Sequence, residues 1–324
     1  MSVRPFLFSL LTSMGALPAA EERHPPIAPP VTALAFAPGG LEVVAGSQAG
    51  IEVRSWPALE PERRVETSLE HVHDLAFDPA GERLCAGGGS PATRGAIELF
   101  AWPGGERLAA IGCGDDVVHA VAWSPDGRVF AAAQHDGTVS VHDPEGDEPV
   151  LRLDGHSRPA LAVVFIDGAT LVSAGADRSL RVWDVPGGRT LRVLENHTEA
   201  VHDLAVRPAG REDGAPALVA SVGADRTLRF WQPAIGRLVR FARLDSAPLS
   251  VAWTAGGDLA VAACSDGRLR AVDPETVDVV AGARAGEGWV FEVAPGPGAR
   301  ELAAGGEGGR VARVLLAGGA AKDE

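Results

Sequence analysis

The sequence predicts an all-β chain of seven repeated four-stranded antiparallel units, and three observations carry the prediction. Tight turns rich in Gly, Asp and Pro recur at matching places. Seven short apolar segments end just before such turns, and successive segments end 40 to 47 residues apart. They are VTALAF (31–36), VHDLAF (72–77), VHAVAW (118–123), ALAVVF (160–165), VHDLAV (201–206), PLSVAW (248–253) and GWVFEV (288–293). This period is typical of four-stranded propeller blades, so we expect a single seven-bladed β-propeller.

The internal order of each unit supports four strands per blade. The first segment leads into a turn such as SPDG (124–127). A strand of small residues follows, such as LVSAG (171–175), and after a tight turn a third strand such as LRVWD (180–184). An outer strand such as TLRVL (190–194) then leads to the next unit. The Gly, Asp and Pro residues lie where antiparallel hairpins need them.

Two units share a set of polar residues at fixed positions. They are His156, Ser173, Asp177 and Trp183 in the fourth unit, and His197, Ser221, Asp225 and Trp231 in the fifth. With Gly155 before the first histidine, these residues resemble the WD40-repeat family of β-propellers, in its bacterial type. The resemblance implies a hydrogen-bonded tetrad within one blade. A buried carboxylate needs donors, and imidazole, hydroxyl and indole groups supply them, so a structural role is expected.

The other units depart from this pattern. The third has Ala132 and His142 where Ser and Trp are expected, and the sixth has Ala262 and Val272. Units one, two and seven lack the turn Asp. The resemblance covers residues 31–316, so it is specific for the fold, but the same fold hosts many functions.

The N-terminal residues differ from the repeats. Residues 1–20 have Arg4, an apolar run and small residues ending at Ala20, which is the order of a secretory signal peptide. We therefore expect export to the periplasm, with a cytoplasmic protein as the alternative. Residues 21–30 form a Pro-rich entry segment, and residues 317–324 form a C-terminal tail. The resemblance implies that the N-terminal part supplies the outer strand of blade seven, either from Ala20–His24 or from Phe6–Leu11.

Composition narrows the class of partner. The net charge of −14 and the pI near 5.1 disfavour nucleic acid, because a polyanion would be repelled. Three scattered cysteines give no metal or disulfide spacing. No phosphate-binding or catalytic motif is present, so we expect no cofactor and no metal. We also expect no integral membrane span, and a chain that is monomeric by itself.

The candidate site is the upper face of the propeller, around the mouth of the central channel. The resemblance places His73, His119 and His202 at one register of the inner strands, with Trp289 at that register in blade seven. The remaining candidates on this face are His135, Arg94 and Glu307. We expect these side chains to contact a partner, with histidine protonation affecting binding between about pH 5 and 8. Asp74 and Asp203 are expected to hydrogen-bond backbone near the channel or to orient the histidines.

The expected function is a non-catalytic scaffold that binds a protein or peptide partner on the upper face. The alternative is a propeller enzyme, or a binder of a small ligand or metal, that uses the histidines at the channel mouth. Apolar residues at the same register, Leu161 and Leu249, separate the polar candidates and favour a broad contact surface over one pocket.

Overall fold

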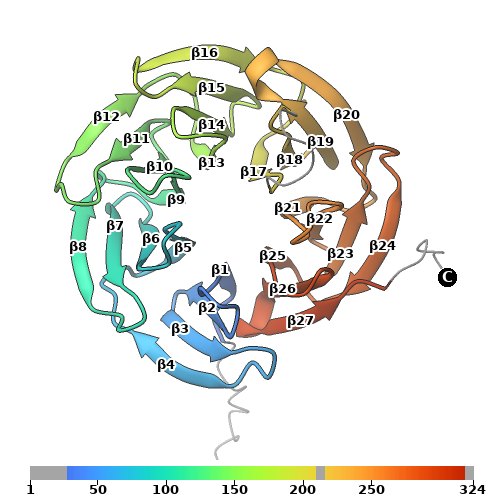
Figure 1. The fold of residues 1–324 in the computed structure, drawn as a ribbon, viewed down its shortest axis with the longest axis horizontal. Coiled ribbons are helices and arrows are strands. Elements are labelled where there is room, and N and C mark those ends of the chain that lie inside the picture. The colour runs from blue at the N-terminus through green and yellow to red at the C-terminus, as the bar shows by residue number, and fades with distance from the viewer. Residues whose placement is uncertain (1–27, 209–215, 318–324) are drawn as a thin grey trace, which may run out of the picture.

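In the part of the chain that the structure describes, twenty-seven strands form seven sheets that follow one another around a central axis (Figure 1). The computed structural model describes residues 28–208 and 216–317. Six sheets have four strands each, and the seventh has three within these residues. Every pair of neighbouring strands within a sheet is antiparallel, as in β1–β2 and β26–β27. The prediction of an all-β seven-bladed propeller is confirmed.

The blades follow one another in chain order, each beginning with its inner strand. Blades one and two contain β1 (Val31–Phe36), β2 (Glu42–Ser47), β3 (Gly50–Ser55), β4 (Pro61–Val65), β5 (Val72–Phe77), β6 (Arg83–Ser90), β7 (Arg94–Ala101) and β8 (Arg107–Gly112). Blades three and four contain β9 (Val118–Trp123), β10 (Phe130–Gln134), β11 (Val139–His142), β12 (Pro149–Leu153), β13 (Ala160–Phe165), β14 (Thr170–Gly175), β15 (Leu180–Asp184) and β16 (Arg189–Leu194).

Among the described residues of the last three blades there are two short 3₁₀ helices besides the strands. Blades five and six contain β17 (Val201–Val206), β18 (Val219–Gly223), β19 (Thr227–Gln232), η1 (Pro233–Ile235), β20 (Arg237–Arg243), β21 (Pro248–Trp253), β22 (Ala260–Cys264), β23 (Arg268–Val272) and β24 (Val279–Arg284). Blade seven contains β25 (Val290–Pro295), β26 (Glu301–Gly306), η2 (Glu307–Gly309) and β27 (Val311–Leu315).

The core lies between the blades. Each pair of neighbouring blades shares one apolar cluster; blades one and two, for example, meet through Val44, Leu75 and Leu84. The last cluster joins blade seven to blade one through Leu34, Val43 and Ala303 and closes the ring. Second strands of small residues are buried along their length, as in β10 (FAAAQ) and β22 (AVAAC). Small side chains suit a strand that has a blade packed on each of its faces.

The register predicted for blade seven is wrong. In β25, Val290 pairs with Gly306 across the same bulge that pairs Val31 with Ser47 in blade one. Phe291 therefore holds the second position of this inner strand, and Trp289 lies just before the strand. The cause is the continuous apolar run Trp289–Val290–Phe291, which offers no alternation to fix which residue faces the channel.

The two segments expected to supply an outer strand to blade seven, Ala20–His24 and Phe6–Leu11, lie outside the described residues. The same is true of the whole segment 1–20. The outermost described strand of blade seven is β27.

Candidate functional site

A central cavity of about 640 Å³ runs along the inner strands. Near its upper end lie the second residues of the seven inner strands: Thr32, His73, His119, Leu161, His202, Leu249 and Phe291. The next residue along three of these strands is acidic, namely Asp74, Asp203 and Glu292. The channel mouth is therefore a ring of three histidines, three apolar side chains and one threonine, next to three carboxylates.

Histidines from blades two and three form a continuous row on this face. The ring centroids of His71 and His73 are 6.1 Å apart, and those of His73 and His119 are 5.9 Å apart. His119 Nε2 lies 3.0 Å from His135 Nδ1, within hydrogen-bond distance. His135 Nε2 in turn lies 3.7 Å from an oxygen of Asp116. The structure thus brings three of the predicted histidines together.

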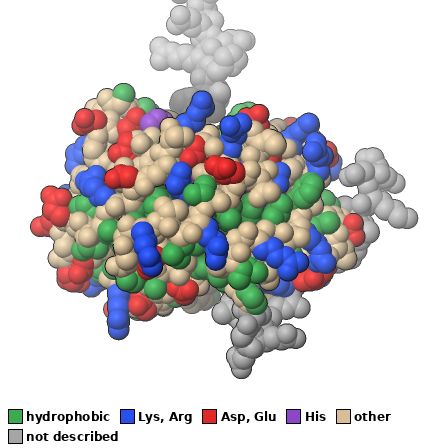
Figure 2. Space-filling model, turned by 90° about the horizontal axis from the view of Figure 1, so that it is seen from above, with side chains coloured by type: hydrophobic (Ala, Val, Ile, Leu, Met, Phe, Trp, Pro, Cys, Tyr) green, Lys and Arg blue, Asp and Glu red, His purple; other side chains and the backbone are tan. Residues whose placement is uncertain are grey.

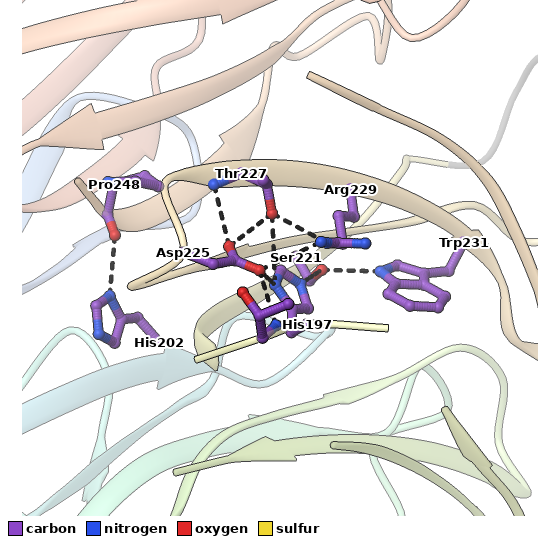
Figure 3. Close-up of polar contacts among 9 residues, drawn as sticks. His197, His202, Ser221, Asp225, Thr227, Arg229, Trp231 and Pro248 are labelled. Carbon is purple, nitrogen blue, oxygen red and sulfur yellow. Dashed lines mark hydrogen bonds and ion pairs between the residues drawn. The ribbon is translucent and has the colours of Figure 1, made fainter. Parts of the chain in front are cut away.

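His202 does not join this row. It belongs to blade five, and its Nδ1 lies 2.9 Å from the carbonyl oxygen of Pro248 in blade six, to which Nδ1–H donates (Figure 3). Its ring lines the same cavity but is held by the neighbouring blade. The sequence placed His73, His119 and His202 in one register, and the fold separates them by their position around the ring.

Two histidines of this row, His73 and His119, have lowered pKa values. Burial lowers the pKa of His119 to about 4, and the nearby His73 and His135 act in the same direction, against the charge of Asp116. Burial also lowers the pKa of His73, with a further contribution from His71. His119 therefore titrates near pH 4, below the window between pH 5 and 8 that its ordinary pKa suggests.

Asp74 and Asp203 join neighbouring blades through the backbone. Asp74 Oδ2 accepts a hydrogen bond from Val121 N at 2.7 Å, and its Oδ1 accepts one from Leu75 N at 2.8 Å. Asp203 repeats both contacts in blades five and six, with Leu204 N and Val251 N at 2.7 Å each. These hydrogen bonds are therefore donated by backbone N–H groups and not by the adjacent histidines.

Sequence reasoning missed Glu292, the third carboxylate. It accepts a hydrogen bond from Ser250 Oγ at 2.8 Å and one from its neighbour Val293 N at 3.1 Å. Removal from bulk water raises the pKa of Glu292 well above its usual range, and the charges of Asp203 and Asp74 add to the rise. The same burial raises the pKa of Asp74 to about 7 and that of Asp203 to about 6. The correct register of blade seven would have placed all three carboxylates at one position.

Replacing Glu292 by Gln should alter how stability depends on pH. Because the folded-state pKa of Glu292 lies above its unfolded value, its contribution to stability is complete at low pH and is lost as pH rises through the folded-state pKa. Glu292→Gln keeps the volume and an acceptor for Ser250 but does not titrate. The variant should therefore gain stability relative to the wild type as the pH rises above the ordinary Glu pKa of 4.5. Urea unfolding at each pH measures this, and parallel curves for the two proteins would contradict it.

Trp289 and Glu307 lie together in a second pocket at the top of blade seven. This pocket of about 310 Å³ is lined by residues 285–290 and 304–308 and by Arg310. The Trp289 side chain is 50% exposed, and its ring centroid lies 5.9 Å from that of Phe291 at the channel mouth. Trp289 therefore borders the mouth, although it does not occupy the register predicted for it. Arg94 is exposed at the start of β7, at the upper turn of blade two.

Hydrogen bonds connect the four residues of each tetrad inside its blade. In blade five, His197 Nδ1 lies 2.9 Å from Asp225 and His197 Nε2 lies 2.7 Å from Ser221 Oγ, while Trp231 Nε1 donates to Ser221 Oγ at 2.8 Å (Figure 3). Because Trp231 occupies an acceptor site of the hydroxyl, Ser221 donates to His197 Nε2, and Nδ1–H of the histidine donates to the carboxylate.

Blade four repeats this chain of hydrogen bonds. His156 Nδ1 lies 3.0 Å from Asp177, and His156 Nε2 and Trp183 Nε1 each lie 2.8 Å from Ser173 Oγ. In both blades the histidine side chain is fully covered. These groups are therefore closed off from solvent and bonded to one another, which is the arrangement expected of structural residues.

Two further residues, not predicted from the sequence, extend each tetrad. Ser179 Oγ donates to Asp177 at 2.8 Å, and Thr227 Oγ1 donates to Asp225 at 2.6 Å. In blade five, Arg229 also lies 3.3 Å from Asp225. Burial alone would raise the pKa of Asp225, but the bonds from Thr227 and His197 outweigh it and lower the pKa to about 2. The signal in the sequence was a hydroxyl residue two positions after each turn Asp.

The blades without the tetrad stabilise their interiors differently. In blade two, the buried Glu98 accepts hydrogen bonds from Thr67 and Ser68 and pairs with Arg107 at 2.9 Å. In blade three, Ser140 Oγ contacts both Gln134 and His142. His142 holds the position that Trp183 has in blade four.

Neither a metal cluster nor a membrane-spanning helix is found in the described part of the chain. Within residues 28–208 and 216–317, no group of three or more His, Cys, Asp and Glu side chains is arranged to hold a metal ion. No helix in the same ranges has the length and apolar character needed to cross a bilayer.

Three segments of the chain match a family model described as WD domain, G-beta repeat: residues 105–143, 147–184 and 188–232. They end with the third strands of blades three, four and five. Nuclear distribution protein PAC1 of Arthroderma otae is 32% identical over 170 residues, which is 48% of this chain and 36% of that protein. The U3 small nucleolar RNA-associated protein 15 homolog of Gallus gallus is 30% identical over 176 residues, 53% of this chain and 33% of that protein.

The likeness to these relatives is partial. WD repeat-containing protein RUP2 of Arabidopsis thaliana is 44% identical over 50 residues, 15% of this chain and 14% of that protein. The matched part of the chain spans about a third of the length of the PAC1 and U3-associated relatives. None of these three relatives has the name of an enzyme.

The relatives correct two expectations. They come from eukaryotes, so the bacterial type of the resemblance is not supported. The predicted periplasmic location is contradicted, because the relatives are eukaryotic proteins named for nuclear distribution and for association with the U3 small nucleolar RNA. The apolar run behind that prediction is short, has one preceding positive charge and is interrupted by Ser9 and Thr12. The three matched segments are therefore similar to WD40 repeats, and they lie within a seven-bladed fold.

Proposed function

We propose that the protein is a non-catalytic scaffold that binds a protein or peptide partner with its upper face. The observation that carries the proposal is the half-exposed Trp289, which stands in a pocket beside the channel mouth. Trp is enriched among residues that dominate binding energy, and a concave neighbour lets it be fully desolvated by a partner. Glu307 and Arg310 in the same pocket provide polar contacts at its rim.

The rest of the upper face extends this contact surface. Phe291 connects Trp289 to the mouth, and the histidine row of His73, His119 and His135 continues it on blades two and three. The ring nitrogens of these histidines offer hydrogen-bonding groups to a partner backbone. His202 and Arg94 complete the predicted set from blades five and two. The net charge of −14 favours a protein partner over nucleic acid, and we propose that the chain is monomeric without its partner.

The polar groups of the channel support this proposal over catalysis. Asp74 and Asp203 accept hydrogen bonds from backbone N–H groups of two blades each, and His202 donates to a backbone carbonyl. These groups hold the ring together, whereas a catalytic base needs an acceptor free to reach its substrate. A relative named for nuclear distribution and one named for association with a small nucleolar RNA are consistent with a scaffold role.

Site-specific photo-crosslinking tests the proposal. A benzophenone amino acid would replace Trp289 on the upper face in one protein, and Leu41 in another. Leu41 is the matched control, since it is 75% exposed and lies in the turn between β1 and β2 at the opposite end of the blade. Irradiation in extract from the native source, followed by mass spectrometry, identifies the protein that each position contacts.

A further inference from the structure

The outer wall of blades four and five has an unusual composition. The segments 189–194 and 232–244, which contain β16, η1 and β20, have five arginines and no Asp or Glu, in a chain whose net charge is −14. The arginines are Arg189, Arg192, Arg237, Arg240 and Arg243. We call the exposed side chains of these two segments the outer-wall patch. A positive surface on an acidic protein is a local feature that the overall charge hides.

Apolar side chains alternate with these arginines on the exterior. Leu191, Val193, Ile235 and Phe241 are each between 42% and 57% exposed. Figure 2 looks onto the side of the ring that carries β16, and it shows hydrophobic side chains across the middle of the wall with basic and acidic side chains above and below them. Contiguous exposed apolar surface edged by polar groups is typical of interaction sites.

Contacts between the two blades make the patch one continuous surface. Arg192 Nε of β16 donates to the carbonyl oxygen of Ala234 in η1 at 3.2 Å. Ile235 follows directly and is exposed at this junction. On β20, the Arg229 guanidinium lies over the inner side of the Phe241 ring, 5.2 Å from its centroid. The exposed aromatic ring is therefore held in place from behind.

Part of the positive charge has no acidic partner within the ring. Arg189 pairs with Asp184 and Arg240 with Glu275, each at 3.0 Å. For Arg192, Arg237 and Arg243, no carboxylate of residues 28–208 or 216–317 lies within ion-pair distance. These three guanidinium groups are available to carboxylates from outside.

The backbone of the patch is also open on one side. β16 and β20 are the last strands of their sheets, so within the described residues each leaves one edge without a strand partner. An extended peptide can add to such an edge through main-chain hydrogen bonds, while its side chains meet those of the strand.

We propose that the outer-wall patch is a second docking surface, separate from the upper face, for an extended acidic segment of a partner protein that also carries apolar side chains. Carboxylates of the segment pair with Arg192, Arg237 and Arg243. Its apolar residues cover Leu191, Ile235 and Phe241. The proposal does not depend on the role of the upper face.

A random library of peptides about 12 residues long, selected on the immobilised full chain, tests this proposal. We expect enrichment of peptides that combine Asp or Glu with apolar residues. Their affinity, measured by fluorescence polarisation, should fall at least ~10-fold in Arg237→Glu and in Leu191→Ser. The matched controls are Arg64→Glu on β4 and Leu108→Ser on β8, which make the same changes on the outer strands of blades one and two and should leave the affinity unchanged.

Other outcomes would overturn the proposal. The first is that the selected peptides are not enriched in Asp or Glu. The second is that the control variants lose as much peptide affinity as the outer-wall variants. The third is that Trp289→Ala loses peptide binding while the outer-wall variants keep it. Two further occupants are tested directly. Arginine-dependent binding to phosphatidylserine vesicles without peptide binding would assign the patch to a membrane surface. Self-association in sedimentation that Arg237→Glu abolishes would assign it to a second copy of the chain.

Discussion

Asp225→Ala should lower the free energy of unfolding by about 3 kcal/mol, because it leaves several buried donors without an acceptor. The Asp225 side chain is 4% exposed and receives hydrogen bonds from His197, Thr227 and Arg229. Each buried donor that loses its acceptor costs about 1–3 kcal/mol, and relaxation of Arg229 toward solvent recovers part of that loss. Chemical denaturation at neutral pH measures the change.

The control for this prediction is Asp266→Ala in blade six. Asp266 holds the same turn position, but Ala262 and Val272 replace the Ser and Trp of the tetrad. Its partner Arg270 keeps a second carboxylate, Asp245, at 2.7 Å. The loss of stability should therefore stay below about 1 kcal/mol. Equal losses in the two variants would show that the tetrad adds nothing beyond the turn itself.

The pH dependence of the wild type should show the same groups. The folded-state pKa of Asp225 is lowered to about 2, so the stability it contributes is present above its unfolded pKa and is lost as pH falls toward 2. Burial lowers the pKa of His197 to about 4, so its protonation in the unfolded state costs stability as pH falls below about 6.5. In Asp225→Ala the carboxylate contribution is absent, and the difference from the wild type should shrink in acid.

Trp289→Ala should weaken binding of the partner by about 2 kcal/mol, or roughly thirtyfold in Kd. The large ring is half exposed in the free protein, so its burial by a partner adds apolar contact with little loss of rotamer freedom. Leu41→Ala on the opposite face should change the affinity by less than about 0.5 kcal/mol. Isothermal titration with the partner identified by crosslinking measures both, and a larger loss from Leu41→Ala would invert the assignment of faces.

The repeat predicted the fold because every blade must bury both faces of its sheet. The seven inner segments, the turns and the tetrads of blades four and five were visible as periodic residue types. Blade seven was harder, since three consecutive apolar residues, Trp289 to Phe291, leave the register of a strand undetermined. Because of that one error, Glu292 was not recognised as a channel residue, and Trp289 was assigned to the strand position that Phe291 occupies.

Other features need three dimensions to be seen. The row from His73 to His135 depends on two contacts: one between blades two and three, with the rings of His73 and His119 5.9 Å apart, and one within blade three, with His119 and His135 3.0 Å apart. The lowered pKa of His119 follows from that packing and not from its sequence position. The outer-wall patch joins strands of two blades through the contact of Arg192 with Ala234, across a separation of 42 residues. No local pattern marks such pairs.

The crosslinking comparison between positions 289 and 41 tests the central claim most directly, since each position reports only what touches it. Partner binding on the upper face predicts one protein attached at high yield through position 289 and none through position 41, with the adduct reduced by excess unlabelled wild-type chain. The same protein attached through position 41 and absent from position 289 would contradict the assignment of the upper face.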